Sequence, residues 1–315
     1  MAADAEFVRR VVRNDRAAVS RAISMVENGH RDATALLKAL FPSTGKAHRI
    51  GITGPPGSGK STITNKLAAL YRGKNLRVGI IAVDPSSPFT GGALLGDRIR
   101  MTEVELDEGV FIRSMASRGS LGGLSRKAKE AADILDASGC DVIFFETVGV
   151  GQSELDIVGA ADTVVVVLVP ESGDSIQAMK AGLMEIADFF VLNKSDRAGA
   201  EQAVRAIKTV LGMRPQTDGW KPDVIQCVAT EGKGVARVEE EIAAYRKYLT
   251  EGGGLERKRR ARAVERIREI VSDRMRVEFW DDGREKLLEE QVAHLSSAET
   301  TPYDIAERLL RDFGR

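Results

Sequence analysis

The segment GPPGSGKS at 54–61 constrains the fold most, because it follows the apolar run RIGIT at 49–53 directly. It matches GxxxxGK[ST] at every fixed position, and the residues after it are typical of a helix. Glycines in such a loop let backbone N–H groups converge on phosphate oxygens, and the helix N-terminus adds a positive dipole end. The pattern predicts an α/β domain that binds nucleotide phosphates through Gly54, Pro55, Pro56, Gly57, Ser58, Gly59, Lys60, Ser61 and Thr62.

Two side chains of this loop have separate expected roles. Lys60 is expected to reach the β and γ phosphates and to act in catalysis, and the Ser61 hydroxyl is expected to bind Mg²⁺.

Short apolar runs alternate with helical stretches from residue 48 onward, as in buried parallel strands joined by crossover helices. The predicted strands are 49–53, 78–83, 110–114, 142–146, 163–169, 189–193 and 224–229. Helices are predicted near 60–72, 124–138, 174–184, 197–212 and 235–249. We therefore expect the P-loop NTPase fold, a doubly wound and mostly parallel sheet covered by helices on both faces.

Three regions are expected along the chain. Residues 1–46 carry apolar residues at helical spacing and predict a helical extension, and 47–250 form the nucleotide-binding domain. The run EGGG at 251–254 reads as a linker, and 251–315 as a C-terminal helical arm. Apolar residues form one helical stripe on this arm, which favours a homodimer: Val264, Ile267, Val271 and Met275.

The composition of the chain limits which kinds of partner and which cellular location we expect. The chain has 46 basic and 46 acidic residues, an even balance that argues against nucleic-acid binding. We find no run long enough to span a membrane and no signal peptide, and we expect a cytoplasmic protein. Cys140 and Cys227 lie beside or inside apolar runs, so we expect small buried side chains and neither a disulfide nor a metal site.

The tetrapeptide Asn193-Lys194-Ser195-Asp196 follows the strand FFVLN and matches the guanine-recognition motif of GTPases. The Asp196 carboxylate can accept both N–H donors of guanine's Watson–Crick edge, whereas adenine offers a ring-nitrogen acceptor there. Lys194 is expected along the base plane, and Asn193 is expected to tie loops together. A third base-contacting loop is expected at Ala229, Thr230, Glu231, Gly232, Lys233 and Gly234.

The segment ETVG at 146–149 occupies the place of the DxxG switch element. Gly149 N–H is the expected γ-phosphate sensor, and Glu146 is expected to hold Mg²⁺ through water. Val150 stands where Ras-like enzymes keep a catalytic Gln, and a valine cannot orient the attacking water. The sequence therefore predicts slow hydrolysis that a partner accelerates.

Further candidates lie in polar segments after strands. Asp84 is placed for the Mg²⁺ shell or for activating water, although a helix or turn cap is the alternative, and Asp97 is a weaker metal candidate. Residues 170–180 contain Lys180 and fit either a mobile switch or a plain connection.

These motifs, GPPGSGKST, VDPSSPFTGGALLGDR, ETVGVGQSE and NKSD, closely resemble the MeaB/ArgK group of metallochaperone-type P-loop GTPases over nearly the whole chain. The resemblance implies a homodimeric GTPase that binds GTP, GDP and Mg²⁺. It also implies an adenosylcobalamin-dependent mutase of the methylmalonyl-CoA type as partner, whose cofactor loading it gates and which it protects from inactivation. It further implies a third switch at 170–180 and a magnesium site among Asp84, Asp97 and Glu146. Cobalamin itself is not expected to bind, since His30, His48 and His294 lie in no recognisable cofactor loop.

Three other functions share this fold. A nickel-insertion GTPase needs Cys and His ligands, of which the chain has no cluster. A kinase of a small molecule or transport protein would use the same phosphate loop, but seldom selects guanine. The third function is that of a binding protein, which changes shape with the bound nucleotide and rarely hydrolyses it.

Overall fold

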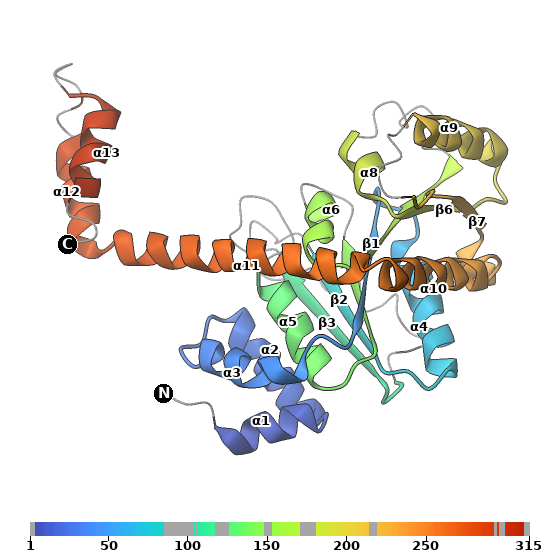
Figure 1. The fold of residues 1–315 in the computed structure, drawn as a ribbon, viewed down its shortest axis with the longest axis horizontal. Helices are drawn as coiled ribbons and strands as arrows, with labels where there is room; N and C mark the ends of the chain where they lie inside the picture. Colours follow the sequence, from blue (N-terminus) through green and yellow to red (C-terminus); the bar gives the residue numbers. More distant parts are fainter. Residues whose placement is uncertain are drawn as a thin grey trace. The chain divides into compact units, whose positions relative to one another are not determined.

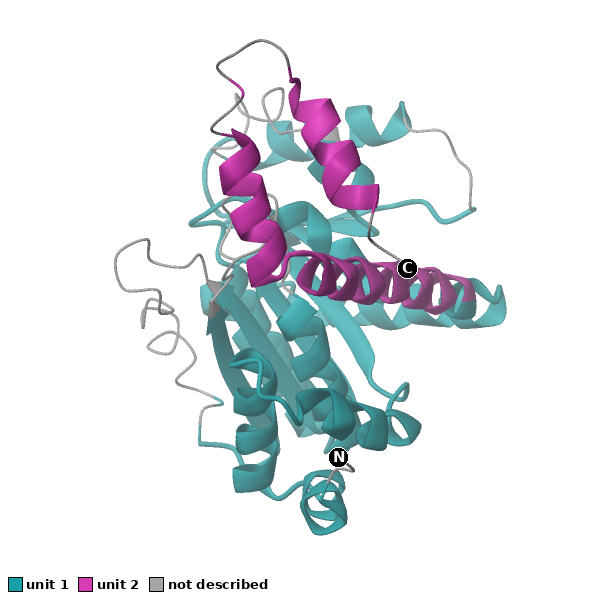
Figure 2. Cartoon of the chain, turned by 90° about the vertical axis from the view of Figure 1, so that its left-hand side faces the viewer, with its two compact units in different colours: residues 1–256 teal, residues 257–315 magenta. Residues whose placement is uncertain are grey.

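The computed structural model describes residues 4–84, 104, 106–116, 126–147, 153–170, 181–213, 219–292, 295 and 300–311. The chain divides into two compact units, Met1–Glu256 and Arg257–Arg315 (Figure 2). The predicted division at residues 46 and 250 stays a prediction.

The first unit is built on a seven-stranded sheet in the order β3-β2-β4-β1-β5-β6-β7, in which every pairing is parallel (Figure 1). The strands are β1 (His48–Thr53), β2 (Val78–Asp84), β3 (Val110–Ala116), β4 (Val142–Thr147), β5 (Thr163–Leu168), β6 (Phe189–Asn193) and β7 (Val224–Cys227). Each matches a predicted apolar run, and the expected fold class is confirmed. The last strand is shorter than predicted, because Ala229 begins the 3-10 helix η5 (Ala229–Glu231).

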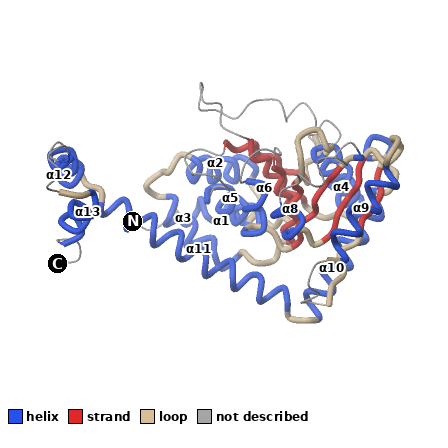
Figure 3. Tube along the Cα trace, turned by 90° about the horizontal axis from the view of Figure 1, so that it is seen from above, coloured by secondary structure: helices blue, strands red, loops and turns tan. Residues whose placement is uncertain are grey.

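Helices cover both faces of the sheet (Figure 3). One face carries α4 (Lys60–Gly73) and α10 (Val235–Glu251). The other carries α1 (Ala5–Val12), α2 (Arg16–Glu27), α3 (Ala33–Leu40), α5 (Arg126–Ala137), η3 (Ile157–Gly159), α8 (Ala181–Ile186) and α9 (Ala200–Gly212). Alternate strand residues face opposite cores, such as Val165 and Val166 on β5. The helix predicted at 174–184 is described only as α8, since 171–180 lie outside the described residues.

The N-terminal helices share the core of the sheet. Val19 and Ile23 of α2 and Leu36 of α3 are fully or almost fully buried in the same cluster as α5. The chain then passes through η1 (Phe41–Ser43) and enters β1. The described part of this segment, residues 4–46, is therefore an integral layer of this unit.

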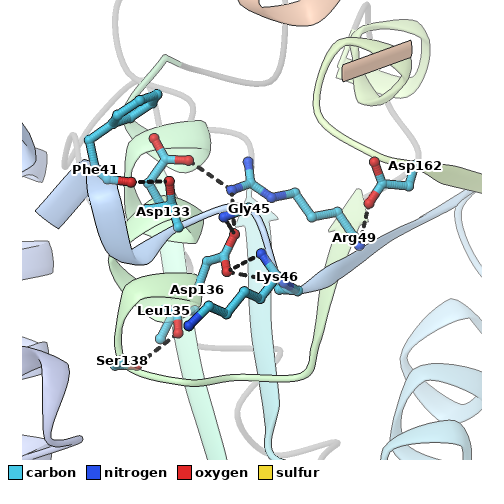
Figure 4. Close-up of polar contacts among 11 residues, drawn as sticks. Phe41, Gly45, Lys46, Arg49, Asp133, Leu135, Asp136, Ser138 and Asp162 are labelled. Atoms are coloured by element: carbon cyan, nitrogen blue, oxygen red, sulfur yellow. Dashed lines mark hydrogen bonds and ion pairs between the residues drawn. The ribbon is translucent and has the colours of Figure 1, made fainter. Parts of the chain in front are cut away.

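A buried ionic cluster holds the entry to β1 (Figure 4). Asp136 of α5 accepts backbone N–H bonds from Gly45 (2.8 Å), Lys46 (3.1 Å) and Ala47 (3.0 Å). The Arg49 guanidinium donates to Asp136 at 3.2 Å and to Asp133 at 2.8 Å. Although burial opposes its charge, these carboxylates raise the pKa of Arg49. The cluster connects residues 45–47, which lead into the sheet, with the first strand and with α5.

The second unit is helical. It contains most of α11 (Gly254–Phe279), with α12 (Asp282–Val292) and α13 (Pro302–Arg311). The predicted linker is a short turn at Gly252 and Gly253, between the end of α10 and the start of α11. Across the described residues, no helix has the length and apolarity needed to cross a membrane.

Candidate functional site

The phosphate loop lies between the end of β1 and the start of α4, at the carboxyl edge of the sheet. Gly59 caps α4 with a left-handed backbone (φ 91°), and a Cβ there would lie 2.2 Å from the Asn193 side-chain nitrogen. Only glycine fits both constraints. The loop therefore delivers the N-terminus of a 14-residue helix to the site, where its dipole favours an anion.

Lys60 is buried at the start of this helix. Its ammonium donates to the carbonyl oxygens of Gly54 (2.8 Å) and Pro55 (2.9 Å). These bonds curl the side chain over its own loop and concentrate positive charge there. In the same loop, the Ser58 hydroxyl is fully buried and has no hydrogen-bond partner among the described residues. A buried ammonium, a helix N-terminus and an unsatisfied hydroxyl together fit the phosphates of a nucleotide.

Ser61 and Glu146 meet beside this loop. The Ser61 hydroxyl donates to a carboxylate oxygen of Glu146, and both residues are buried, at 9% and 3% exposure. Glu146 lies on β4, the neighbour of β1, and its register partner there is Ile52. Hydroxyl and carboxylate oxygens are hard donors of the type that Mg²⁺ prefers. These two residues could hold the magnesium ion of a bound nucleotide.

Asn193 joins two loops at the end of β6. Its side-chain nitrogen donates to the Ser58 carbonyl (2.9 Å), and its side-chain oxygen accepts the Ala229 N–H (3.0 Å). Lys194 reaches back to the Gly57 carbonyl at 2.9 Å. The 193–196 segment is thus tied to the phosphate loop, in agreement with the loop-joining role expected of Asn193.

The third loop follows β7. Val228 N–H donates to the Lys233 carbonyl at 3.0 Å, which closes residues 229–232 into a compact turn. The exposed Lys233 pairs with Glu231 at 2.6 Å, and this hydrogen bond raises the pKa of Lys233. Asp196 is exposed and adds a smaller attraction to the same ammonium. The loop predicted at 229–234 therefore lies beside Asp196, and base contact by either stays a prediction.

Three residues at the same edge were given no individual role by the sequence analysis. Thr53 ends β1, Thr147 ends β4, and Glu154 belongs to α6 (Ser153–Asp156). Their buried polar groups form a chain: the Thr147 hydroxyl donates to Thr53 Oγ1 at 3.0 Å, and the Thr53 hydroxyl donates to the Glu154 carbonyl at 3.3 Å. A threonine as the last residue of a buried strand is the signal that could have identified Thr53 and Thr147, whereas no sequence signal marks the Glu154 carbonyl.

The remaining predicted site residues lie at or beyond the limits of the described residues. Asp84 is the last residue of β2, so its backbone lies at this edge, beside the end of β4. Asp97, Gly149, Val150, Lys180 and most of the 170–180 segment lie outside the described residues.

The cysteines behave as small buried side chains, as expected. Cys140 and Cys227 are free and buried, and burial raises the pKa of their thiols to about 12 and about 11. Among the residues that the structure describes, no group of three or more His, Cys, Asp or Glu side chains could hold a metal ion.

Comparisons with known proteins show which family and which fold this chain resembles. A family model described as methylmalonyl-CoA mutase-associated GTPase MeaB matches residues 19–284. A protein of Pyrococcus horikoshii named as a GTPase is 54% identical over 270 residues, covering 85% of each chain. The GTPase ArgK of Escherichia coli is 38% identical over 277 residues, covering 85% of this chain and 84% of the relative. A crystal structure titled LAO/AO transport system kinase superposes with a TM-score of 0.74 at 29% identity, covering 98% of this chain and 96% of that one.

Proposed function

The chain belongs to the MeaB family of methylmalonyl-CoA mutase-associated GTPases, and we propose that it is the nucleotide-dependent chaperone of an adenosylcobalamin-dependent mutase. Its own reaction is the hydrolysis of GTP to GDP and phosphate. The observation that carries the mutase proposal is the family match, which extends from α2 to α12. In this proposal, the nucleotide state controls cofactor loading and protects the mutase from inactivation.

We assign a separate role in this reaction to each group of site residues. Lys60 and the N-terminus of α4 bind the phosphates, while Ser61 and Glu146 hold Mg²⁺, with Asp84 and Asp97 as further candidates. The bound Mg²⁺ would neutralise charge on the phosphates. Asp196 selects guanine from the 193–196 segment, which Asn193 ties to the 229–234 loop. Gly149 senses the γ-phosphate, and Lys180 acts from the 170–180 segment as part of a third switch.

Hydrolysis by the chain alone is proposed to be slow. Val150 offers no group to orient water, so the partner must complete the catalytic arrangement. The test mixes the purified chain with a purified methylmalonyl-CoA mutase and measures phosphate release from GTP. We expect the mutase to raise kcat about tenfold or more, equivalent to about 1.4 kcal/mol of transition-state stabilisation. Equal rates with and without mutase, together with no binding in GTP or GDP, would reject the proposed partner.

A second candidate function follows from the structural relative titled as a transport system kinase. A kinase transfers the γ-phosphate to an acceptor other than water. Incubation of the chain with γ-labelled GTP and a cell extract separates the two functions: labelled inorganic phosphate alone supports hydrolysis, whereas label on another molecule supports a kinase.

The homodimer is also a proposal. Helix α11 buries none of its described residues, and four apolar side chains on one side of it are 42–60% exposed: Val264, Ile267, Val271 and Met275. A second copy of this helix would remove that apolar surface from water. Sedimentation should give a dimer for the parent chain and a monomer for Ile267→Glu combined with Val271→Glu. Arg266→Glu, on the opposite side of the helix, is the control and should remain dimeric.

A further inference from the structure

Ser195 lies between Lys194 and Asp196, and it makes two hydrogen bonds to a single acceptor. Its backbone N–H and its hydroxyl both donate to the Cys227 carbonyl oxygen, each at 3.1 Å. A carbonyl oxygen has two lone pairs, so both donors can bind it at once. Cys227 ends β7 and is 1% exposed, and its register partner on β6 is Asn193. Ser195 is therefore attached twice to a buried residue of the neighbouring strand.

The peptide group that accepts these two bonds also closes the 229–234 loop. Its carbonyl belongs to Cys227, and its N–H belongs to Val228, which donates to the Lys233 carbonyl at 3.0 Å. Because a peptide group is planar and stiff, a restraint on its carbonyl also orients its N–H. Ser195 and the 229–234 loop are thus bonded to the same rigid group of atoms.

Ser195 and Asp196 are the two central residues of a β-turn. Arg197 N–H donates to the Lys194 carbonyl at 3.1 Å, which closes the turn. Lys194 enters it with a left-handed backbone (φ 57°), a conformation that is strained for a residue with a side chain and persists only where neighbouring contacts hold it. Those contacts are the bond from Lys194 to the phosphate loop and the bonds from Ser195 to β7. Because the two central residues share one turn, fixing Ser195 restricts the direction in which Asp196 points.

The Asp196 carboxylate is exposed and attracts the Lys233 ammonium, so it lies beside the loop that the same peptide group closes. We propose that Ser195 is a positioning residue for guanine selection: its hydroxyl holds the turn that carries Asp196 in one arrangement relative to the 229–234 loop. The inference rests on the guanine selection by Asp196 stated in the proposed function. Ser195 contacts no nucleotide in this scheme, and it acts through the carboxylate that follows it.

The test removes the hydroxyl and measures discrimination between bases. Ser195→Ala loses the hydroxyl bond to Cys227 but keeps the backbone N–H bond, so the turn should still form. Competition against a fluorescent nucleotide gives the Kd for GDP and for IDP, whose base lacks the amino group that Asp196 would bind. We expect the ratio of the IDP Kd to the GDP Kd to fall about fivefold in Ser195→Ala, the size of one net hydrogen bond. Ser195→Thr keeps the hydroxyl and should retain the parental ratio.

Two further comparisons separate positioning from stability. Ser138→Ala also removes a hydroxyl that donates to a backbone carbonyl, that of Leu135 at 2.8 Å, but Ser138 lies between α5 and the start of β4, at the opposite edge of the sheet. This control should lower the thermal midpoint and leave the IDP-to-GDP ratio unchanged. Should Ser195→Ala fail to fold, Ser195→Val and Ser195→Thr have nearly the same shape and differ in the hydroxyl, and the valine variant should show the lower ratio.

The outcomes separate this inference from the function on which it rests. A parental ratio in folded Ser195→Ala, or equal ratios in the valine and threonine variants, overturns the positioning role and leaves guanine selection by Asp196 intact. A parent chain that binds GDP and IDP with equal Kd overturns that selection itself, and the positioning role with it. A fall of the ratio in Ser138→Ala would show that the ratio follows overall stability, which also overturns the role of Ser195.

Discussion

The hydroxyl of Ser61 donates a hydrogen bond to the carboxylate of Glu146, a residue 85 positions later in the chain. Ser61 lies in the first turn of α4, which follows β1 through the phosphate loop, and Glu146 is the second-last residue of β4, the strand paired with β1. Parallel strands bring their carboxyl ends to one edge, so the phosphate loop and the switch strand meet there.

Removal of the Ser61 hydroxyl is predicted to raise the Mg²⁺ concentration needed for hydrolysis. Ser61→Ala should increase the half-saturating Mg²⁺ concentration about tenfold, about 1.4 kcal/mol, because one oxygen donor is lost beside Glu146. Titration of Mg²⁺ in a GTP hydrolysis assay measures this half-saturating concentration. Ser61→Thr keeps the hydroxyl and should behave as the parent. An unchanged Mg²⁺ dependence in the alanine variant would show that Ser61 does not bind the metal ion.

Asp196→Asn is predicted to exchange guanine for xanthine. The amide loses one acceptor and gains a donor, which suits the carbonyl of xanthine in place of the guanine amino group. The expected loss of GTP affinity is about 100-fold or more, since unpaired groups would remain at the base edge. Competition of XTP and GTP against a fluorescent nucleotide measures the change. A variant that still prefers GTP would show that Asp196 does not read the base.

Asn193→Ala is predicted to loosen the phosphate loop and the 229–234 loop together. It removes the bonds to the Ser58 carbonyl and the Ala229 N–H, leaving two buried groups without their partner. We expect the free energy of unfolding to fall by about 2 kcal/mol. Urea unfolding measures this loss, and the nucleotide Kd should rise as well. A loss of stability with unchanged Kd would restrict Asn193 to a structural role.

Asp136→Ala is predicted to destabilise the first unit strongly. The carboxylate is 1% exposed, and its removal leaves three backbone N–H groups and the Arg49 charge without that partner. Breaking a buried ion pair costs about 3–5 kcal/mol. The exposed pair of Arg205 and Glu201 is the control, and Arg205→Ala should cost less than about 1 kcal/mol. Equal unfolding midpoints for the two variants would contradict the stabilising role of Asp136 in the buried ionic cluster.

The two thiols are predicted to resist modification in the folded chain. Burial raises the pKa of Cys227 to about 11 and that of Cys140 to about 12, so each is a neutral thiol at pH 8. Because the thiolate is the reactive species, an aromatic disulfide reagent should react with both only after denaturation. The raised pKa values also stabilise the fold below the unfolded pKa near 9, and this contribution is lost as pH rises through the folded values. Fast reaction of either thiol in the native chain would contradict its burial.

Much of the fold could be predicted because its signals are local. Seven apolar runs separated by helical stretches indicate parallel strands with crossover helices, and each run became a strand. The end of β7 was misjudged, since Val228 and Ala229 are apolar but leave the ladder for a turn closed by Lys233. The apolar pattern reports burial, and burial continues past the last strand pairing.

The sequence by itself determined the phosphate loop, the order of strands and helices along the chain, and the family, because each depends on short contiguous motifs. The tertiary structure decided which distant groups meet: Asn193 with Ser58, Asp136 with the entry to β1, and Thr53 with Thr147 and Glu154. These contacts join residues about 90 to 135 positions apart. No local pattern encodes them, because they arise only when the sheet order places the ends of β1, β4 and β6 at one edge and packs α5 and α6 onto the same face.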